Sequence, residues 1–286
     1  MLDAALTSLR FGFEHFLNSY EDPERLRQAV IDIHVGIELL LKERLARENP
    51  LFVIDKIDEK SAIEAHLTRN HPPQSVRAGQ RTVGFEGALS RLERLGLLPR
   101  TADRTRLTRL NQLRNELVHA GSSAQLDEGL QLIAADAVKF VNDFLREQLG
   151  TASEKVFGTG PWTSVRALSM KVSDERERAF QKKLGQHRAR VATLSPDDVT
   201  ERMRTTIDLG TDETRTMQCP ACDHEAYVGV HIEGPDDFDD GIPLGGGAYV
   251  EEIQCQVCEL RLEGVDLDRF QHLADELLAA QYEEYR

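Results

Sequence analysis

The chain has 286 residues, which is long enough for two domains, because a domain typically contains about 100–200 residues. Its composition, 40% hydrophobic and 29% charged, is that of a soluble globular protein. The sequence has no apolar run of the roughly 18 residues that a membrane span needs, and its first residues lack the pattern of a signal peptide. We therefore expect a cytoplasmic protein without a membrane segment.

The net charge of −14 is unevenly distributed along the chain. Residues 1–150 carry a net charge of −2, whereas residues 151–286 carry −12. Within the first part, the segment 77–114 contains nine arginines and three acidic residues. This local excess of positive charge is a candidate surface for the phosphates of RNA, and the alternative is a set of solvated helix faces.

Most of the first 150 residues show apolar side chains at helical spacing, which predicts a helical bundle. We expect helices over residues 3–19, 24–48, 85–98, 101–119 and 125–149. An inserted loop at 50–84 is expected to contain a short helix near 60–69. After residue 150, the segment 151–213 is expected to be a helical connector, with a loop at 158–162 and a charged helix at 174–194.

The pattern changes near residue 215 to short β-like runs, which end in a further helical pattern. We expect strands over 227–232, 249–254 and 260–265, a glycine- and aspartate-rich loop over 234–247, and a closing helix over 266–285. The predicted fold class is therefore mainly α. It has three parts, a helical domain (1–150), the connector (151–213) and a small β module with its closing helix (214–286).

Two Cys-x-x-Cys pairs lie in the β module, Cys219 with Cys222 and Cys255 with Cys258, separated by 32 residues. In a reducing compartment such pairs indicate a metal rather than a disulfide. Two tight turns that each present two thiolates complete a tetrahedral site suited to Zn²⁺, and four protein ligands leave no open position for catalysis. The sequence therefore predicts a structural zinc ribbon, with redox-active thiols as the alternative.

The surroundings of this zinc ribbon are acidic, with several aspartates and glutamates between the cysteine pairs. Such a charge disfavours contact with nucleic acid, and with it a zinc-ribbon regulator of transcription. We expect the ribbon to contact protein instead, either a partner such as an antitoxin or the arginine-rich segment of the helical domain.

The run Arg114-Asn115-Glu116-Leu117-Val118-His119 carries the groups needed to cleave RNA. An arginine offers a fixed positive fork to a phosphodiester, and a histidine moves protons near neutral pH. Because RNA supplies its own 2′-hydroxyl nucleophile, these two groups can act without a metal. The alternatives are an ion pair of Arg114 with Glu38 or Glu116, and a favourable contact of His119 with carbonyls at a helix end.

Arg114-Asn115 with His119 resembles the signature of the HEPN superfamily, an arginine, commonly followed by a polar residue, and a histidine four to six residues further on. The segment 33–42 is similar to the second helix of that family, and the resemblance covers about residues 1–149. It implies a helical bundle, a homodimer whose active site straddles the interface, and metal-independent RNA cleavage in toxins and antiviral defence proteins. By position, Arg114 and His119 would carry catalysis, Asn115 would support the groove, and Glu38 would be an accessory group.

The sequence therefore predicts a homodimeric, metal-independent endoribonuclease that acts on RNA. Its expected biological role is that of a toxin or an antiviral effector. The alternative is a protein without catalytic activity, in which the HEPN-like domain dimerises and the zinc ribbon recruits a protein partner. Fold resemblance does not decide between these two, because the family contains inactive members.

Overall fold

The computed structural model describes residues 1–19, 22–56, 81–98, 101–119, 127–233, 237–239, 242–244, 247–274 and 276–277. The protein is mainly helical, with a small four-stranded antiparallel sheet near the C-terminus, so the coarse fold class predicted from the sequence is confirmed. Its residues group into two compact units, Met1–Ser173 and Asp174–Arg286. The expected connector, 151–213, therefore contributes to both units.

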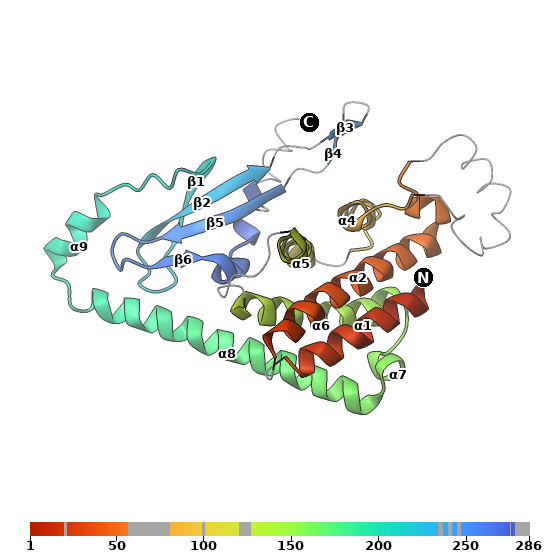
Figure 1. Ribbon diagram of the computed structural model, residues 1–286. Helices are drawn as coiled ribbons and strands as arrows, with labels where there is room; N and C mark the ends of the chain where they lie inside the picture. Colours follow the sequence, from red (N-terminus) through yellow and green to blue (C-terminus); the bar gives the residue numbers. More distant parts are fainter. Residues whose placement is uncertain are drawn as a thin grey trace. The chain divides into compact units, whose positions relative to one another are not determined.

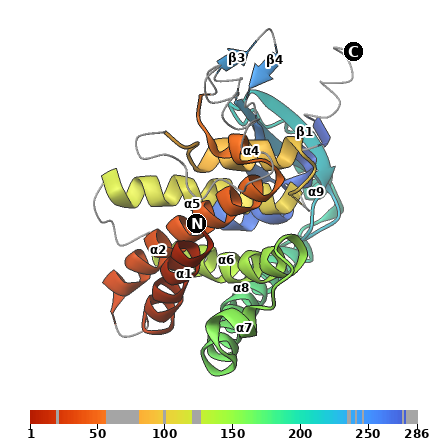
Figure 2. The same ribbon diagram turned by 90° about the vertical axis from the view of Figure 1, so that its right-hand side faces the viewer.

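Unit 1 is built from helices (Figures 1 and 2). Its elements are α1 (Leu2–Leu17), α2 (Pro23–Glu48), the 3-10 helix η1 (Pro50–Val53), α4 (Phe85–Arg94), α5 (Thr101–His119), α6 (Asp127–Gln148), α7 (Ser153–Phe157) and the first half of α8 (Thr159–Val191). The start of α2 follows from its sequence, because the Asp22 carboxylate accepts the backbone N–H of Glu24 and Pro23 occupies the first turn. The short helix expected near 60–69 lies outside the described residues.

Helices α1 and α2 pack side by side and form the centre of unit 1, and α4, α5 and α6 also contact α2 (Figure 1). Glycines allow the close approach of the first two helices. A Cβ atom at Gly36 would lie 2.5 Å from Cγ of Leu9, and one at Gly12 would lie 2.7 Å from Cγ1 of Ile33. The two backbones therefore approach more closely than any larger residue at these positions permits.

The prediction of a loop at 158–162 is wrong, because α8 already begins at Thr159. Pro161 lies in its first turn, where a missing backbone N–H costs no hydrogen bond. Trp162 is buried, and its ring centroid lies 5.8 Å from that of Phe13 and 5.4 Å from that of Phe157. This aromatic contact fixes the start of the helix, although the local sequence Gly-Thr-Gly-Pro is typical of a loop.

Unit 2 contains the second half of α8, a short helix and the sheet. Its further elements are α9 (Pro196–Met203), β1 (Glu213–Gln218), β2 (Glu225–Glu233), β3 (Asp237–Asp239), β4 (Ile242–Leu244), β5 (Gly247–Gln254), β6 (Arg261–Glu263) and the 3-10 helix η3 (Gly264–Arg269). The sheet order is β1-β2-β5-β6, and each pair is antiparallel. The strands β3 and β4 pair with each other in a separate hairpin.

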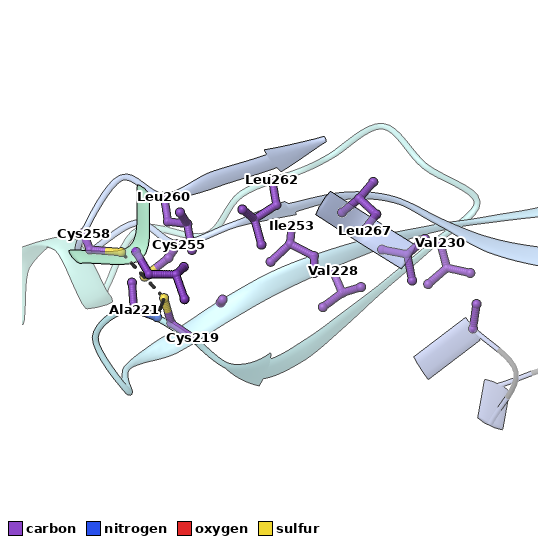
Figure 3. Packing of buried hydrophobic residues seen from close by; sticks show 14 of the residues in the cluster. Cys219, Ala221, Val228, Val230, Ile253, Cys255, Cys258, Leu260, Leu262 and Leu267 are labelled. Atoms are coloured by element: carbon purple, nitrogen blue, oxygen red, sulfur yellow. Dashed lines mark hydrogen bonds between the residues drawn. The ribbon is translucent and has the colours of Figure 1, made fainter. Parts of the chain in front are cut away.

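One face of the sheet forms the core of unit 2. The register places Val228 opposite Ile253 and Ile253 opposite Leu262, so these aliphatic side chains form a row across three strands. Phe180 and Leu184 of α8 belong to the same buried cluster. Figure 3 shows this aliphatic row continuing to cysteine side chains at one end of the sheet.

Three parts of unit 2 differ from the expectation. Strand β1 was not expected, because its side chains are mostly exposed and lack apolar alternation. Strands β3 and β4 lie within the stretch 234–247 that was expected to be a loop. The closing helix expected from residue 266 begins as the 3-10 helix η3, residues 272–274 and 276–277 are helical, and the remainder lies outside the described residues.

Candidate functional site

Arg114 lies on α5 and is half-buried, and the neighbouring Asn115 is exposed. The guanidinium Nη1 of Arg114 donates a hydrogen bond of 3.0 Å to Oδ1 of Asn115. Among the described side chains, Arg114 therefore pairs with Asn115 and with neither Glu38 nor Glu116. His119 is the last residue of α5, and its side chain lies outside the described residues.

Glu38, the expected accessory group, lies on α2 and is engaged in an ion pair. Its Oε1 is 2.6 Å from Nζ of Lys42, one helical turn further on. Lys42 is almost fully buried and also donates a hydrogen bond of 3.1 Å to Oγ1 of Thr82. The Glu38 carboxylate therefore compensates a buried ammonium group, as a buried charge requires.

A residue that the sequence analysis did not single out, His34, lies one turn before Glu38 on α2 and is only 3% exposed. Its Nε2 is 2.8 Å from Oδ1 of Asn111 on α5, and Nδ2 of Asn111 donates a hydrogen bond of 3.0 Å to Oε1 of Glu86 on α4. The imidazole stacks on the ring of Phe85, with centroids 4.5 Å apart and an interplanar angle of 18°. A polar relay that begins at the buried His34 and ends at the exposed Glu86 thus joins three helices.

The relay determines which nitrogen of His34 carries the proton. The amide nitrogen of Asn111 donates to Glu86, so its oxygen, which can only accept, faces His34. Nε2 of His34 is then the donor, and Nδ1 keeps its lone pair. Burial lowers the pKa of His34, which the nearby positive charge of Arg114 lowers further and the contacts with Asn111 and Glu38 partly offset.

The signal for this cluster was present in the sequence. His34, Glu38 and Lys42 repeat at intervals of four residues, which places them on one face of a helix whose neighbouring positions are mostly apolar. Their partners Asn111 and Glu86 are far away in the sequence, and no local pattern connects them with α2.

Several arginines of the segment 77–114 stabilise unit 1 rather than project freely. The guanidinium of Arg91 donates to the carbonyl oxygens of Phe52, Ile54 and Asp55 at 2.9, 2.7 and 3.1 Å, and burial lowers its pKa. Arg104 pairs with Glu93 at 2.6 Å. The positive charge available to a ligand is therefore smaller than the count of arginines suggests.

The four cysteines of unit 2 lie close together. Their sulfur atoms are all within 4.8 Å of one another, and three of the four residues are buried. The Sγ atoms of Cys219 and Cys258 are 3.6 Å apart, as are those of Cys222 and Cys255, so each close pair combines the two Cys-x-x-Cys segments. Such a set of four thiols could hold a metal ion such as zinc.

The two Cys-x-x-Cys turns have the same backbone geometry. The backbone N–H of Cys219 donates to the carbonyl of His224 at 2.7 Å, and that of Cys255 donates to the carbonyl of Leu260 at 2.9 Å. The residue after each second cysteine, Asp223 or Glu259, has a positive φ, 62° and 56° respectively. This left-handed conformation is costly for residues other than glycine, so both turns are held in a strained shape.

The four thiols are electrostatically incompatible with simultaneous ionisation. Burial raises the pKa of Cys222 to about 12. The contact with Cys219 also raises the pKa of Cys258, whereas hydrogen bonds from Cys219 and Cys258 lower the pKa of Cys255. Four thiolates at these distances repel one another strongly, and a bound cation is the physical means of ionising them together.

The end of α8 contacts both cysteine turns. Nδ1 of His187 lies 2.8 Å from the carbonyl oxygen of Cys258, and Nε of Arg188 donates a hydrogen bond of 2.9 Å to the carbonyl of Ala221. Both contacts engage backbone atoms within a turn rather than a sulfur. They attach the helix to the cluster without using a ligand position.

Helix α9 makes a similar contact. Nη1 of Arg202 donates to the carbonyl of Val257 at 3.1 Å and to Oε1 of Glu259 at 2.7 Å. A capping box at Ser195 and Asp198 defines the start of this helix. Helices on both sides of residue 195 are therefore bound to the second cysteine turn.

Comparison of the chain with known protein families, with characterised proteins and with solved structures gave no match. Within the described residues, the helices are too short or too polar to cross a lipid bilayer.

Proposed function

We propose that the protein is a metal-independent endoribonuclease of the HEPN type, acting as a homodimer at a site built around Arg114 and His119. The observation that supports this proposal is the half-buried guanidinium of Arg114, which lies beside the exposed amide of Asn115 and within electrostatic range of a buried polar cluster on α2. An arginine whose guanidinium is fixed in place by one hydrogen bond, with further N–H groups left to donate, is suited to bind a phosphodiester.

In the proposed reaction, the 2′-oxygen attacks the adjacent phosphorus and the bond from phosphorus to the 5′-oxygen breaks. His119 accepts the proton of the 2′-hydroxyl, and the same residue of the second subunit donates a proton to the leaving 5′-oxygen. Arg114 stabilises the charge that develops on the phosphoryl oxygens. The products are a 2′,3′-cyclic phosphate and a 5′-hydroxyl. The two histidines carry both proton transfers, so the proposed reaction uses no metal ion.

Incubation of the full chain with RNA in the presence of EDTA tests this function. We expect cleavage with 2′,3′-cyclic phosphate ends, and its loss in Arg114→Ala and His119→Ala variants that keep their helicity. A requirement for Mg²⁺ that is satisfied by adding the ion back would contradict the proposed site. A folded protein without cleavage would favour the non-catalytic interaction module instead.

We also propose that the four cysteines bind one Zn²⁺ ion with a structural role. The donor set fits this ion, because four sulfur atoms from two turns surround a common centre and would complete its coordination. Zinc would supply the positive charge that ionises the thiols and stabilises both turns. The acidic composition of the surrounding segment supports a protein, such as an antitoxin, rather than RNA as the partner of unit 2.

A further inference from the structure

A buried acceptor and a buried donor occur together in the polar cluster of unit 1. Nδ1 of His34 and Nε of Arg114 are both enclosed by protein, and neither has a hydrogen-bond partner among the described residues. A buried polar group without a partner loses its hydration and gains nothing in exchange. Such a group calls for an explanation, and one explanation is a further state of the molecule in which the group is used.

The two groups lie on adjacent helices that contact each other. Asn111, which accepts the N–H of His34, precedes Arg114 by three residues on α5, so both residues lie on the same side of that helix. The guanidinium also acts electrostatically on the imidazole. A lone pair at Nδ1 and an N–H at Nε are complementary in hydrogen bonding.

We propose that His34 is a positioning residue for Arg114, whose Nε–H it accepts at Nδ1 when the guanidinium turns from Asn115 toward a phosphate. This inference rests on the proposed role of Arg114 in RNA cleavage. With Nε engaged by His34, the edge formed by Nη1 and Nη2 is left for two phosphoryl oxygens. The relay through Asn111 to Glu86 keeps the lone pair of His34 on the nitrogen that is needed.

Two substitutions separate this role from a purely structural one. His34→Gln places an amide N–H near the position of Nε2 and keeps the hydrogen bond to Asn111, but it offers no acceptor at the position of Nδ1. His34→Asn places its side-chain oxygen near Nδ1 and gives up the contact with Asn111. A structural role predicts that Gln is the better replacement, whereas the positioning role predicts that Asn is.

The first measurement is the rate of RNA cleavage by the full chain. We expect His34→Gln to lower the rate at least about tenfold, as the loss of a hydrogen bond to a charged group implies, and His34→Asn to recover most of it. His15→Gln, which changes a histidine that faces Asp32 at 3.8 Å, serves as the control and keeps the wild-type rate. Equal rates for His34→Gln and the wild type would overturn the proposal.

The second measurement does not depend on catalysis. ¹⁵N NMR of the full chain follows the Nε–H of Arg114, assigned by its absence in Arg114→Lys, during titration with an RNA whose 2′-hydroxyl is replaced by hydrogen. We expect the signal to shift and to become protected from solvent exchange in the wild type and in His34→Asn, but not in His34→Gln. A wild type that binds this RNA without cleaving the natural one refutes the catalytic function and leaves the positioning role standing.

The imidazole signals of the wild type complete the test, even where His34→Gln fails to fold. An unprotonated Nδ1 whose shift moves on addition of the RNA supports the proposal. A protonated Nδ1, or an Arg114 signal that does not respond to the RNA, overturns it.

Discussion

Nδ1 of His187 lies 2.8 Å from the carbonyl oxygen of Cys258, so the end of a 33-residue helix is attached directly to a cysteine turn. Since zinc would hold that turn in its strained shape, removal of the metal should release the helix end. We expect chelation to accelerate amide hydrogen exchange at residues 187–191 and 257–260. Hydrogen-exchange mass spectrometry of the full chain before and after chelation measures this effect.

The same helix provides an internal control. Its first half belongs to unit 1, where Oγ of Ser169 donates a hydrogen bond of 2.8 Å to the carbonyl of Ala135. Exchange at residues 163–172 should therefore not change on chelation. Uniform acceleration along α8, or no change near residue 187, would contradict the attachment of the helix end to a metal centre.

Replacement of Arg114 tests the need for a planar cation. Arg114→Ala should lower RNA cleavage by about 100-fold to 1,000-fold, as loss of one transition-state donor typically does. Arg114→Lys keeps the charge but loses the paired N–H groups, so most of the loss should remain. Arg146→Lys, on an exposed arginine that binds Asp143 and Glu147 on α6, is the matched control. Full activity of Arg114→Lys would show that charge alone suffices.

The sequence predicted helices α1, α2, α4, α5 and α6, because each buries an apolar stripe that repeats at helical spacing, although α4 ends at Arg94 and not at residue 98. It failed at residues 158–162, where Trp162 packs on side chains of α1 and α7 and overrides a loop-like local sequence. Strand β1 was not predicted, because its backbone pairing with β2 defines it and its exposed side chains show no apolar alternation.

The two candidate sites differ in the same way. The spacing of the four cysteines in the sequence predicts that they lie close together, because each Cys-x-x-Cys pair places two thiols on one turn. The relay of His34 depends on Asn111 and Glu86 from two other helices, and such contacts between distant segments leave no local signal in one sequence. Arg114 and Asn115 were recognisable because they are adjacent in sequence, whereas no local pattern connects Arg114 with His34 on α2.

Gly36 is expected to be essential for the packing of α1 on α2. An alanine there would place Cβ 2.5 Å from Cγ of Leu9, which forces the helices apart and should lower the free energy of unfolding of unit 1 by about 1–3 kcal/mol. Gly129→Ala on α6 is the control, because nothing lies within 4 Å of its Cβ position. Thermal or urea unfolding of both variants should show opposite signs, since alanine favours a helix where space allows.

Val118 tests the proposed dimer. It is 49% exposed on α5 beside the Arg114–His119 run, and Val35, next to His34 on α2, is exposed as well. If a second copy covers this face, Val118→Glu would place a charge in the interface and should weaken dimerisation at least about tenfold. Analytical ultracentrifugation measures the change, with Met170→Glu on the exposed face of α8 as the control. An unchanged dimer, or a monomeric wild type, would rule out this face.

The stability of unit 1 should depend on pH through His34. Burial lowers its pKa in the folded state below the ordinary value of 6.5, so the unfolded chain binds the proton more readily. The contribution of neutral His34 to folding is therefore complete above pH 6.5 and decreases as the pH falls toward the lowered value. Two charged groups modify this effect of burial on the pKa, since Glu38 raises it and Arg114 lowers it.

A comparison of urea unfolding between the wild type and His34→Gln isolates this effect, because the amide does not titrate. The free energy of unfolding should fall more steeply for the wild type as the pH is lowered through 6.5, the ordinary pKa of the imidazole. Parallel curves for the wild type and His34→Gln would mean that His34 accepts a proton in the folded state as easily as in the unfolded chain. In that case protonation would remove the lone pair assigned to Nδ1 once the pH falls below 6.5, the ordinary pKa of the imidazole.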